Sequence, residues 1–93
     1  MNKYEMIYIL ETNTTDEEKE ALIEKFQGVV TKNGGAVESV EKWGIKKLAY
    51  PIDYKTDGYY VYMTFEGDSN LVQEVKRVVG ISEHVLRRLI TKR

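Results

Sequence analysis

The order of strand-like and helix-like segments is the feature of this sequence that most limits its fold. Runs rich in β-branched and aromatic residues, the usual composition of strands, occupy residues 4–10, 36–52, 59–66 and 85–91. Two segments with helical spacing of apolar residues lie between these runs, after residue 15 and after residue 68. The order β-α-β-β-α-β predicts a ferredoxin-like α+β domain, with two helices on one face of a four-stranded antiparallel sheet. We expect residues 1–93 to form this single domain, with strands one and three central and strands two and four at the edges.

Short local patterns indicate where the two helices begin and end. Thr15 and Glu18 have the spacing of a capping box, in which the threonine hydroxyl accepts the backbone N–H three residues later. Asn33-Gly34-Gly35 should end that helix, because glycine readily adopts the left-handed conformation that follows a helix C-terminus. Asp68 or Ser69 should cap the second helix. Helical spacing predicts the buried residues Leu22, Phe26, Val29 and Val30 in the first helix, and Leu71, Val72, Val75, Val78 and Val79 in the second, which Gly80 should end.

The second strand and its connection to the third carry three further signals. Gly44 predicts a bulge or bend within residues 36–52. Pro51 cannot donate a ladder hydrogen bond, which favours an edge position for this strand. Residues 55–58, Lys-Thr-Asp-Gly, predict a turn before the third strand.

The sequence offers little for catalysis or for metal binding. It has no cysteine, and His84 is its one histidine, so neither a thiolate site nor a two-histidine zinc site can be built. A ferredoxin-like acylphosphatase would need an arginine in the phosphate-binding segment after the first strand, but residues 11–15 begin with a glutamate and contain no arginine. We therefore predict no enzyme activity, no cofactor, no metal and no small-molecule substrate.

Membrane and secretory signals are not evident in the sequence. No apolar run approaches the roughly 20 residues that a membrane-spanning helix requires, and the first residues do not resemble a secretory signal. The lack of cysteine suits a reducing compartment. We therefore expect a cytoplasmic protein with no membrane partner.

The two central strands are apolar on both sides. Ile7 and Ile9 of the first strand, and Tyr60 and Tyr62 of the third, fall on the face opposite to the other apolar residues of those strands. A sheet covered by helices on one face is expected to be polar on the other. Because contiguous exposed apolar groups usually bind a partner, we interpret the uncovered face as a docking surface. The alternative is that central strands are simply apolar throughout and that the tyrosine hydroxyls stay hydrated.

The charges are balanced overall but unevenly distributed. The formal net charge is -1 and the sequence pI is about 5.8, whereas a protein that binds nucleic acid alone is usually strongly basic. Residues 16–24 are strongly acidic, while residues 87–93 hold four bases and no acid. This asymmetry favours one face turned toward an anionic surface. An aromatic sheet that stacks single-stranded RNA, as in RRM domains, is a weaker interpretation, because Asp57 stands where that motif needs a base.

Residues 43–52, Trp-Gly-Ile-Lys-Lys-Leu-Ala-Tyr-Pro-Ile, resemble the signature of the bacterial small-subunit ribosomal protein six family. Residues 3–6 and 57–59 match that family as well, so the resemblance covers nearly the whole chain. It implies a ferredoxin-like fold and a structural role in the small ribosomal subunit. It also implies binding to small-subunit ribosomal RNA together with the basic ribosomal protein eighteen, as a heterodimer. Ile45 departs from the family, many of whose members carry a third base there, which weakens the electrostatic contact expected at that point.

The candidate contact residues are of two kinds. The candidates for contact with RNA phosphate or with the partner protein are Lys3, Lys46, Lys47, Arg87, Arg88, Lys92 and Arg93. The candidates for packing or stacking are Tyr4, Tyr50, Tyr60 and Tyr62. Arg87 and Arg88 should point to opposite sides of the fourth strand, so one of them should serve the uncovered face. An alternative from another class is a ferredoxin-like small-ligand regulatory or dimerisation domain, which would pair its sheets and bind a metabolite between them.

Overall fold

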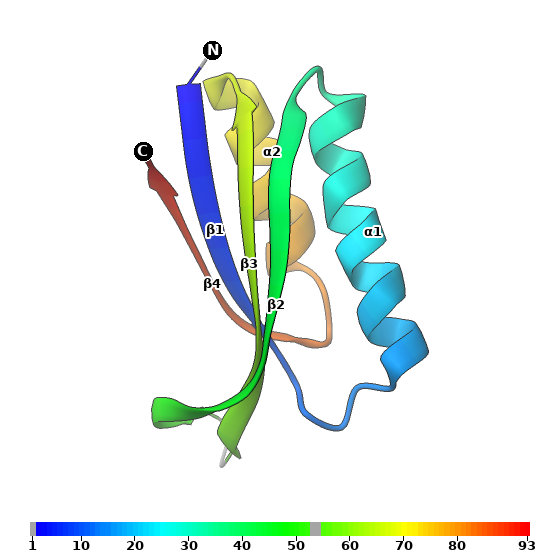
Figure 1. The fold of residues 1–93 in the computed structure, drawn as a ribbon, viewed down its shortest axis with the longest axis vertical. Helices are drawn as coiled ribbons and strands as arrows, with labels where there is room; N and C mark the ends of the chain where they lie inside the picture. The colour runs from blue at the N-terminus through cyan, green and yellow to red at the C-terminus, as the bar shows by residue number, and fades with distance from the viewer. Residues whose placement is uncertain (1, 53–54) are drawn as a thin grey trace.

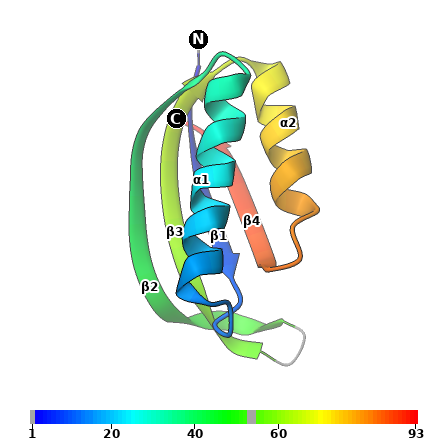
Figure 2. The ribbon, with the colours of Figure 1, turned by 90° about the vertical axis from the view of Figure 1, so that its right-hand side faces the viewer.

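The computed structural model has the predicted order of elements; it describes residues 2–52 and 55–93, with the backbone alone for residues 49–52 and 55. The elements are β1 (Asn2–Leu10), α1 (Asp16–Lys32), β2 (Ala36–Ile52), β3 (Lys55–Gly67), α2 (Ser69–Gly80) and β4 (Val85–Lys92). Figures 1 and 2 show both helices lying against the same face of the sheet. The predicted ferredoxin-like β-α-β-β-α-β fold is confirmed.

The sheet is antiparallel, and its strands lie in the order β2-β3-β1-β4. β1 and β3 are therefore central, and β2 and β4 form the edges, as predicted. β1 pairs with β3 in unbroken register from Asn2↔Gly67 to Leu10↔Tyr59. Because side chains alternate across a strand, this register decides which residues face the helices and which face away.

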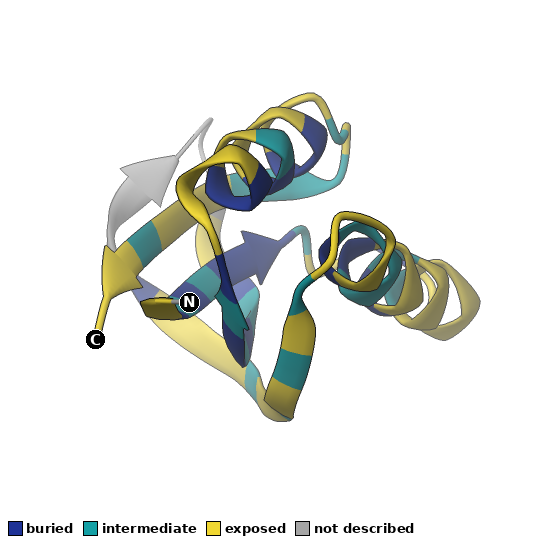
Figure 3. Ribbon diagram, turned by 90° about the horizontal axis from the view of Figure 1, so that it is seen from above, coloured by how far each residue is buried: buried dark blue, intermediate teal, exposed yellow. Residues whose placement is uncertain are grey.

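The hydrophobic core lies between the sheet and the two helices. Figure 3 shows the buried positions gathered on the inner sides of both helices and on the strands that the helices cover. Burying one large apolar side chain contributes roughly 1.5–3 kcal/mol, so this layer supplies most of the driving force for folding. The largest fully buried side chains are those of Tyr8, Phe26, Phe65, Met6, Leu10 and Met63.

The buried face of α1 differs from the prediction in part. Ile23, Phe26 and Val30 are buried, while Leu22 and Val29 pack against the core only in part. Spacings of three and four residues place the three buried side chains along one stripe of the helix. In α2 the predicted residues are all buried.

Both helices begin at side-chain caps, as the sequence indicates. The Thr15 hydroxyl accepts a hydrogen bond from the backbone N–H of Glu18 at 3.2 Å, and the Asp68 carboxylate accepts one from the N–H of Leu71 at 2.9 Å. Such caps satisfy backbone donors that have no partner within the helix, and each is worth about 1 kcal/mol. Past the end of α1, Gly34 takes a φ of 83°, which explains the glycine at this position.

The pairing between β2 and β3 confirms one sequence prediction and corrects another. Gly44 has a φ of 84° and sits at a register shift, as expected for a bulge. The turn predicted at residues 55–58 is wrong, because β3 begins at Lys55 and the ladder continues through Lys47↔Asp57 and Lys46↔Gly58.

Close packing explains the glycine within this ladder. Residues 46–52 and 55–58 pair with each other beyond the end of the β1–β3 ladder, and we call them the β2–β3 extension. This extension bends across the end of the sheet (Figure 1), where Leu48 and Ile9 are both buried. A Cβ atom on Gly58 would lie 2.2 Å from Ile9 Cγ2 and 3.2 Å from Leu48 Cδ2. Gly58 therefore serves side-chain packing between the extension and β1, and not the conformation of a turn.

Candidate functional site

The sheet surface opposite to the helices, here called the open face, carries the apolar and aromatic residues Ile7, Ile9, Trp43, Tyr60, Tyr62 and Leu89. Directly paired residues of antiparallel strands project to the same side of a sheet. Ile7 pairs with both Tyr62 and Leu89, and Ile9 pairs with Tyr60. The central strands are therefore apolar on both sides, as predicted.

Most of the open face is accessible to a partner. Ile7, Tyr60 and Tyr62 are half-buried, and Leu89 is 56% exposed. Ile9 differs from them, because it is buried beside Gly58 and Leu48 of the β2–β3 extension. Contiguous apolar and aromatic side chains at the surface are typical of a docking site.

Trp43 and Tyr62 form an aromatic pair on the open face. Their rings are stacked, with centroids 5.1 Å apart and planes 13° apart. The Lys46 ammonium lies 4.9 Å from the centroid of the Trp43 ring, within the range of a cation–π contact. Trp43 was not among the contact residues predicted from the sequence. A signal was present, because Glu41 pairs with Tyr62 and Trp43 stands two residues after Glu41, on the same side of the strand.

The Glu5 carboxylate holds Tyr62 from the neighbouring strand. It accepts hydrogen bonds from the Tyr62 hydroxyl at 2.7 Å and from the Thr91 hydroxyl at 3.0 Å. The Tyr62 hydrogen bond, followed by that from Thr91, lowers the pKa of Glu5 below its ordinary value of 4.5. The same bond raises the pKa of Tyr62 above 10.0, because it stabilises the protonated phenol.

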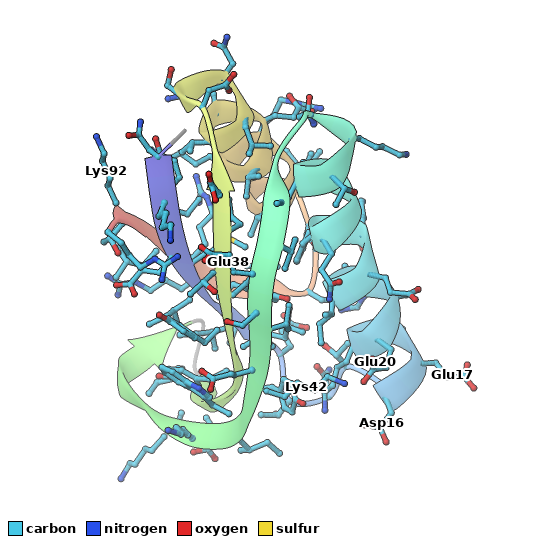
Figure 4. All side chains as sticks on the ribbon, turned by 45° about the horizontal axis from the view of Figure 1, so that its top comes forward. Asp16, Glu17, Glu20, Glu38, Lys42 and Lys92 are labelled. Carbon is cyan, nitrogen blue, oxygen red and sulfur yellow. The ribbon has the colours of Figure 1, made fainter. Side chains whose placement is uncertain are left out.

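Two of the predicted RNA- or partner-binding cations are paired within the chain. Lys3 Nζ lies 3.7 Å from Glu38, and the Arg93 guanidinium forms an ion pair and a hydrogen bond with the same carboxylate. The backbone N–H of Arg93 also donates a hydrogen bond to the backbone carbonyl of Lys3 at 2.8 Å. Glu38, labelled in Figure 4, thus binds cations from the start of β1 and from the end of the chain.

The pleat of β4 sorts its basic residues onto two sides. Arg87 pairs with Ile9 and shares the open face, whereas Arg88 pairs with Tyr8 and shares the helix side. This arrangement agrees with the expectation that Arg87 and Arg88 point in opposite directions. Lys92 pairs with Tyr4 and also belongs to the helix side; Figure 4 shows it extending into solvent.

The remaining candidates lie in different environments. Tyr4 is 8% exposed and stacks on Phe65 at 5.7 Å in the core, so little of its ring is left for a partner. Lys46 and Lys47 are exposed on the β2–β3 extension. The side chain of Tyr50 lies outside the described residues.

Residues that could perform chemistry are scarce in the described part of the chain. No group of three or more His, Cys, Asp or Glu side chains there could hold a metal ion. His84 lies 2.9 Å from the Glu18 carboxylate at the start of α1, in an ion-pair geometry that ties the α2–β4 connection to this helix. None of the helices described is long and apolar enough to cross a membrane.

The fold and the open face define a class: a small ferredoxin-like domain with an uncovered, partly aromatic sheet. Comparison with known proteins narrows that class to proteins of the ribosome. The model of the family described as "Ribosomal protein S6" matches residues 3–92. The chain therefore belongs to the ribosomal protein S6 family, a family of ribosomal proteins and not of enzymes.

Individual relatives agree with this assignment. The chain is 46% identical over 92 residues to the small ribosomal subunit protein bS6 of Thermoanaerobacter pseudethanolicus, covering 99% of this chain and 97% of the relative. It is 44% identical to the same protein of Alkaliphilus metalliredigens, with the same coverage. The crystal structure of 30S ribosomal protein S6 from Thermotoga maritima superimposes with a TM-score of 0.93 at 27% identity, covering 99% of this chain and 87% of that one.

Proposed function

We propose that this protein is a structural component of the small ribosomal subunit that binds small-subunit ribosomal RNA cooperatively with the basic ribosomal protein eighteen. In this proposal the open face receives the partner protein, and RNA is bound by the pair. The single observation that carries the proposal is the open face itself, where Ile7, Tyr60 and Tyr62 are half-buried and Leu89 is exposed, with no helix over them in the described part of the chain.

The charge of the chain supports a cooperative mechanism. Affinity for RNA depends strongly on lysine and arginine contacts to phosphate. Here the net charge is -1, and several cations are neutralised within the chain: Lys3 and Arg93 by Glu38, Lys42 by Glu20, and Arg77 by Glu74. A basic partner would supply the phosphate attraction that this chain lacks on its own.

The apolar residues of the open face fit a protein partner. Burial of a side chain such as Leu89 or Trp43 by a partner would contribute roughly 1–2 kcal/mol each. Tyrosine, tryptophan and methionine are enriched at protein interfaces, and the stacked Trp43–Tyr62 pair offers a rigid aromatic contact. The Lys46 ammonium already lies over the Trp43 ring, which leaves less of that ring for a stacked base.

Binding measurements with and without the partner test the proposal. We expect the isolated chain to bind small-subunit ribosomal RNA weakly, and the mixture with ribosomal protein eighteen to bind it at least tenfold more tightly, as about 1.4 kcal/mol of coupling would give. Filter binding or fluorescence anisotropy at several salt concentrations measures both affinities. Tight and weakly salt-dependent RNA binding by the isolated chain would contradict the cooperative mechanism.

A further inference from the structure

We propose that a basic groove between α2 and the outer edge of β4 binds the phosphate groups of RNA; this inference rests on the proposed function and assigns the RNA contact to a particular side of the molecule. The groove has a volume of about 310 Å³ and is lined by Lys76, Arg88, Leu89 and Ile90. Two of these lining residues are cations and none is an acid. We call this site the edge groove.

The cations of the edge groove differ from those around the open face. Within the described residues, neither Lys76 nor Arg88 forms an ion pair, and the same is true of Lys92, two residues beyond Ile90 on the same side of β4. Lys3 and Arg93, in contrast, both contact Glu38. A cation that already has a carboxylate partner gains less from a phosphate, because the new contact must replace the old one. The edge groove therefore holds positive charge that is available to an anion.

The packing of Arg88 places its guanidinium between the strand and the helix. A Cβ atom on Gly80 would lie 3.3 Å from Arg88 Cζ, so the guanidinium rests against the α2 backbone at a residue that has no side chain. A favourable interaction with the negative end of the α2 dipole accounts for this position of Arg88. The helix dipole does not explain the presence of Lys76, which lies one turn earlier on α2. Lys76 adds a second positive charge to the same groove.

The outer edge of β4 adds hydrogen-bond donors. β4 pairs with β1 alone among the described strands, so backbone N–H groups along its other edge have no strand partner. Backbone N–H groups and arginine forks are both common ligands of RNA and DNA phosphates. The Arg88 guanidinium, the Lys76 ammonium and the backbone N–H groups at the edge of β4 together suit the phosphates of an RNA backbone.

Electrostatics favours RNA over the protein partner as the occupant of this groove. The partner in the proposed function is basic, so Lys76 and Arg88 would repel its cations. The open face contributes apolar contacts and carries the carboxylates of Glu5 and Glu41 as well as Arg87, so it offers a basic protein a mixed surface and not a purely cationic one. The two surfaces share Leu89, but Arg88 and the rest of the open face lie on different sides of β4, so that protein and RNA can be bound at the same time.

A pair of matched double variants tests this assignment. Lys76→Gln with Arg88→Gln removes both charges of the edge groove, and Lys3→Gln with Arg93→Gln removes two charges that are already paired with Glu38. Each variant is mixed with ribosomal protein eighteen, and its affinity for small-subunit ribosomal RNA is measured across a salt series. Partner affinity without RNA is measured in parallel, and circular dichroism confirms that each variant is folded.

We expect the edge-groove variant to bind RNA at least tenfold more weakly, with the slope of log affinity against log salt reduced by about 1–2, and to bind the partner normally. In the matched control, the slope should fall by less than half as much as in the edge-groove variant. Unchanged RNA affinity of the edge-groove variant would overturn the inference and leave the proposed function intact. Loss of partner affinity instead would overturn it by making the groove a protein site. If the unmodified chain and its partner bound no small-subunit RNA at all, the proposed function itself would fail, and this inference with it.

Discussion

Two carboxylates determine how the open face presents its charge and its aromatic groups. Glu38 neutralises Lys3 and Arg93, and Glu5 fixes the Tyr62 hydroxyl against β1. Neither contact follows from the chain's local sequence, since their partners are 35 to 57 residues apart along it. The sequence predicted the basic residues as contact sites, but only the fold shows which of them have an internal partner.

Glu5 is expected to make acid stability depend on its ionisation. A carboxyl whose pKa is lowered by folding contributes stability above its unfolded pKa of about 4.5, and this contribution is lost as the pH falls through the lower, folded pKa. In Glu5→Gln, the free energy of unfolding should therefore decrease less than in the unmodified protein as the pH falls from 6 to about 2. Urea unfolding at several pH values measures the difference, and Tyr62→Phe should reproduce part of it. Parallel pH profiles for Glu5→Gln and the unmodified chain would refute this role of Glu5.

Tyr8 gives a second prediction for a single residue. Its ring packs edge-on against Phe26 at 5.1 Å, but its hydroxyl is buried with no hydrogen-bond partner among the described residues. Burial also raises the pKa of Tyr8 far above its ordinary value, because the phenolate could not be solvated there. Since an unsatisfied buried hydroxyl costs about 1 kcal/mol or more, Tyr8→Phe should leave the free energy of unfolding unchanged or raise it by about that amount. A loss of stability on chemical denaturation would show that the hydroxyl is hydrogen-bonded in solution.

The elements show which parts of the fold the sequence could predict. Helix caps at Thr15 and Asp68 and the bulge at Gly44 depend on residues close in the chain, and all three are present as predicted. The turn expected before β3 was misplaced, because the role of Gly58 depends on Ile9, which comes from a strand distant in sequence. Local composition could not distinguish a glycine needed for a turn from a glycine needed for close packing.

Two glycine substitutions separate these effects. Gly58→Ala should lower the free energy of unfolding by about 1–3 kcal/mol, because its Cβ would overlap Ile9 and the sheet would have to shift. Gly28→Ala, in the middle of α1 with no atom within 4 Å of the added Cβ, should raise it by roughly 0.5–1 kcal/mol. Thermal and urea unfolding of both variants tests the pair. Equal effects of the two substitutions would mean that the packing of the β2–β3 extension is not maintained in solution.

The whole molecule is asymmetric, with helices on one face of its sheet and an uncovered face on the other (Figure 2). Alternation in the sequence located the uncovered apolar residues Ile7, Tyr60 and Tyr62, but it did not identify Trp43 or Leu89 as members of the open face. Their positions depend on strand pairing at the two edges of the sheet. The candidate site was thus predictable at its centre and not at its margins.

A substitution of Leu89 tests whether the open face is the partner-binding surface. Leu89→Ser should weaken binding of ribosomal protein eighteen by about tenfold, since a side chain that is 56% exposed in the isolated chain would be buried by the partner. Ile81→Ser is the matched control, because Ile81 is 67% exposed but lies at the end of α2, away from the open face. Isothermal titration calorimetry of both variants gives the comparison. Equal losses, or none, would remove the open face from the proposed interface.

The alternation of side chains along β4 also bears on the order of assembly. Arg87 and Leu89 project to one side of this strand, and Arg88, Ile90 and Lys92 project to the other. Apart from Leu89, which borders both surfaces, ligands on opposite sides of this strand do not compete for space, so neither has to arrive first. If both proposals hold, this chain can bind the protein first and the RNA second, or the RNA first and the protein second. The total free energy of binding must be the same for both orders.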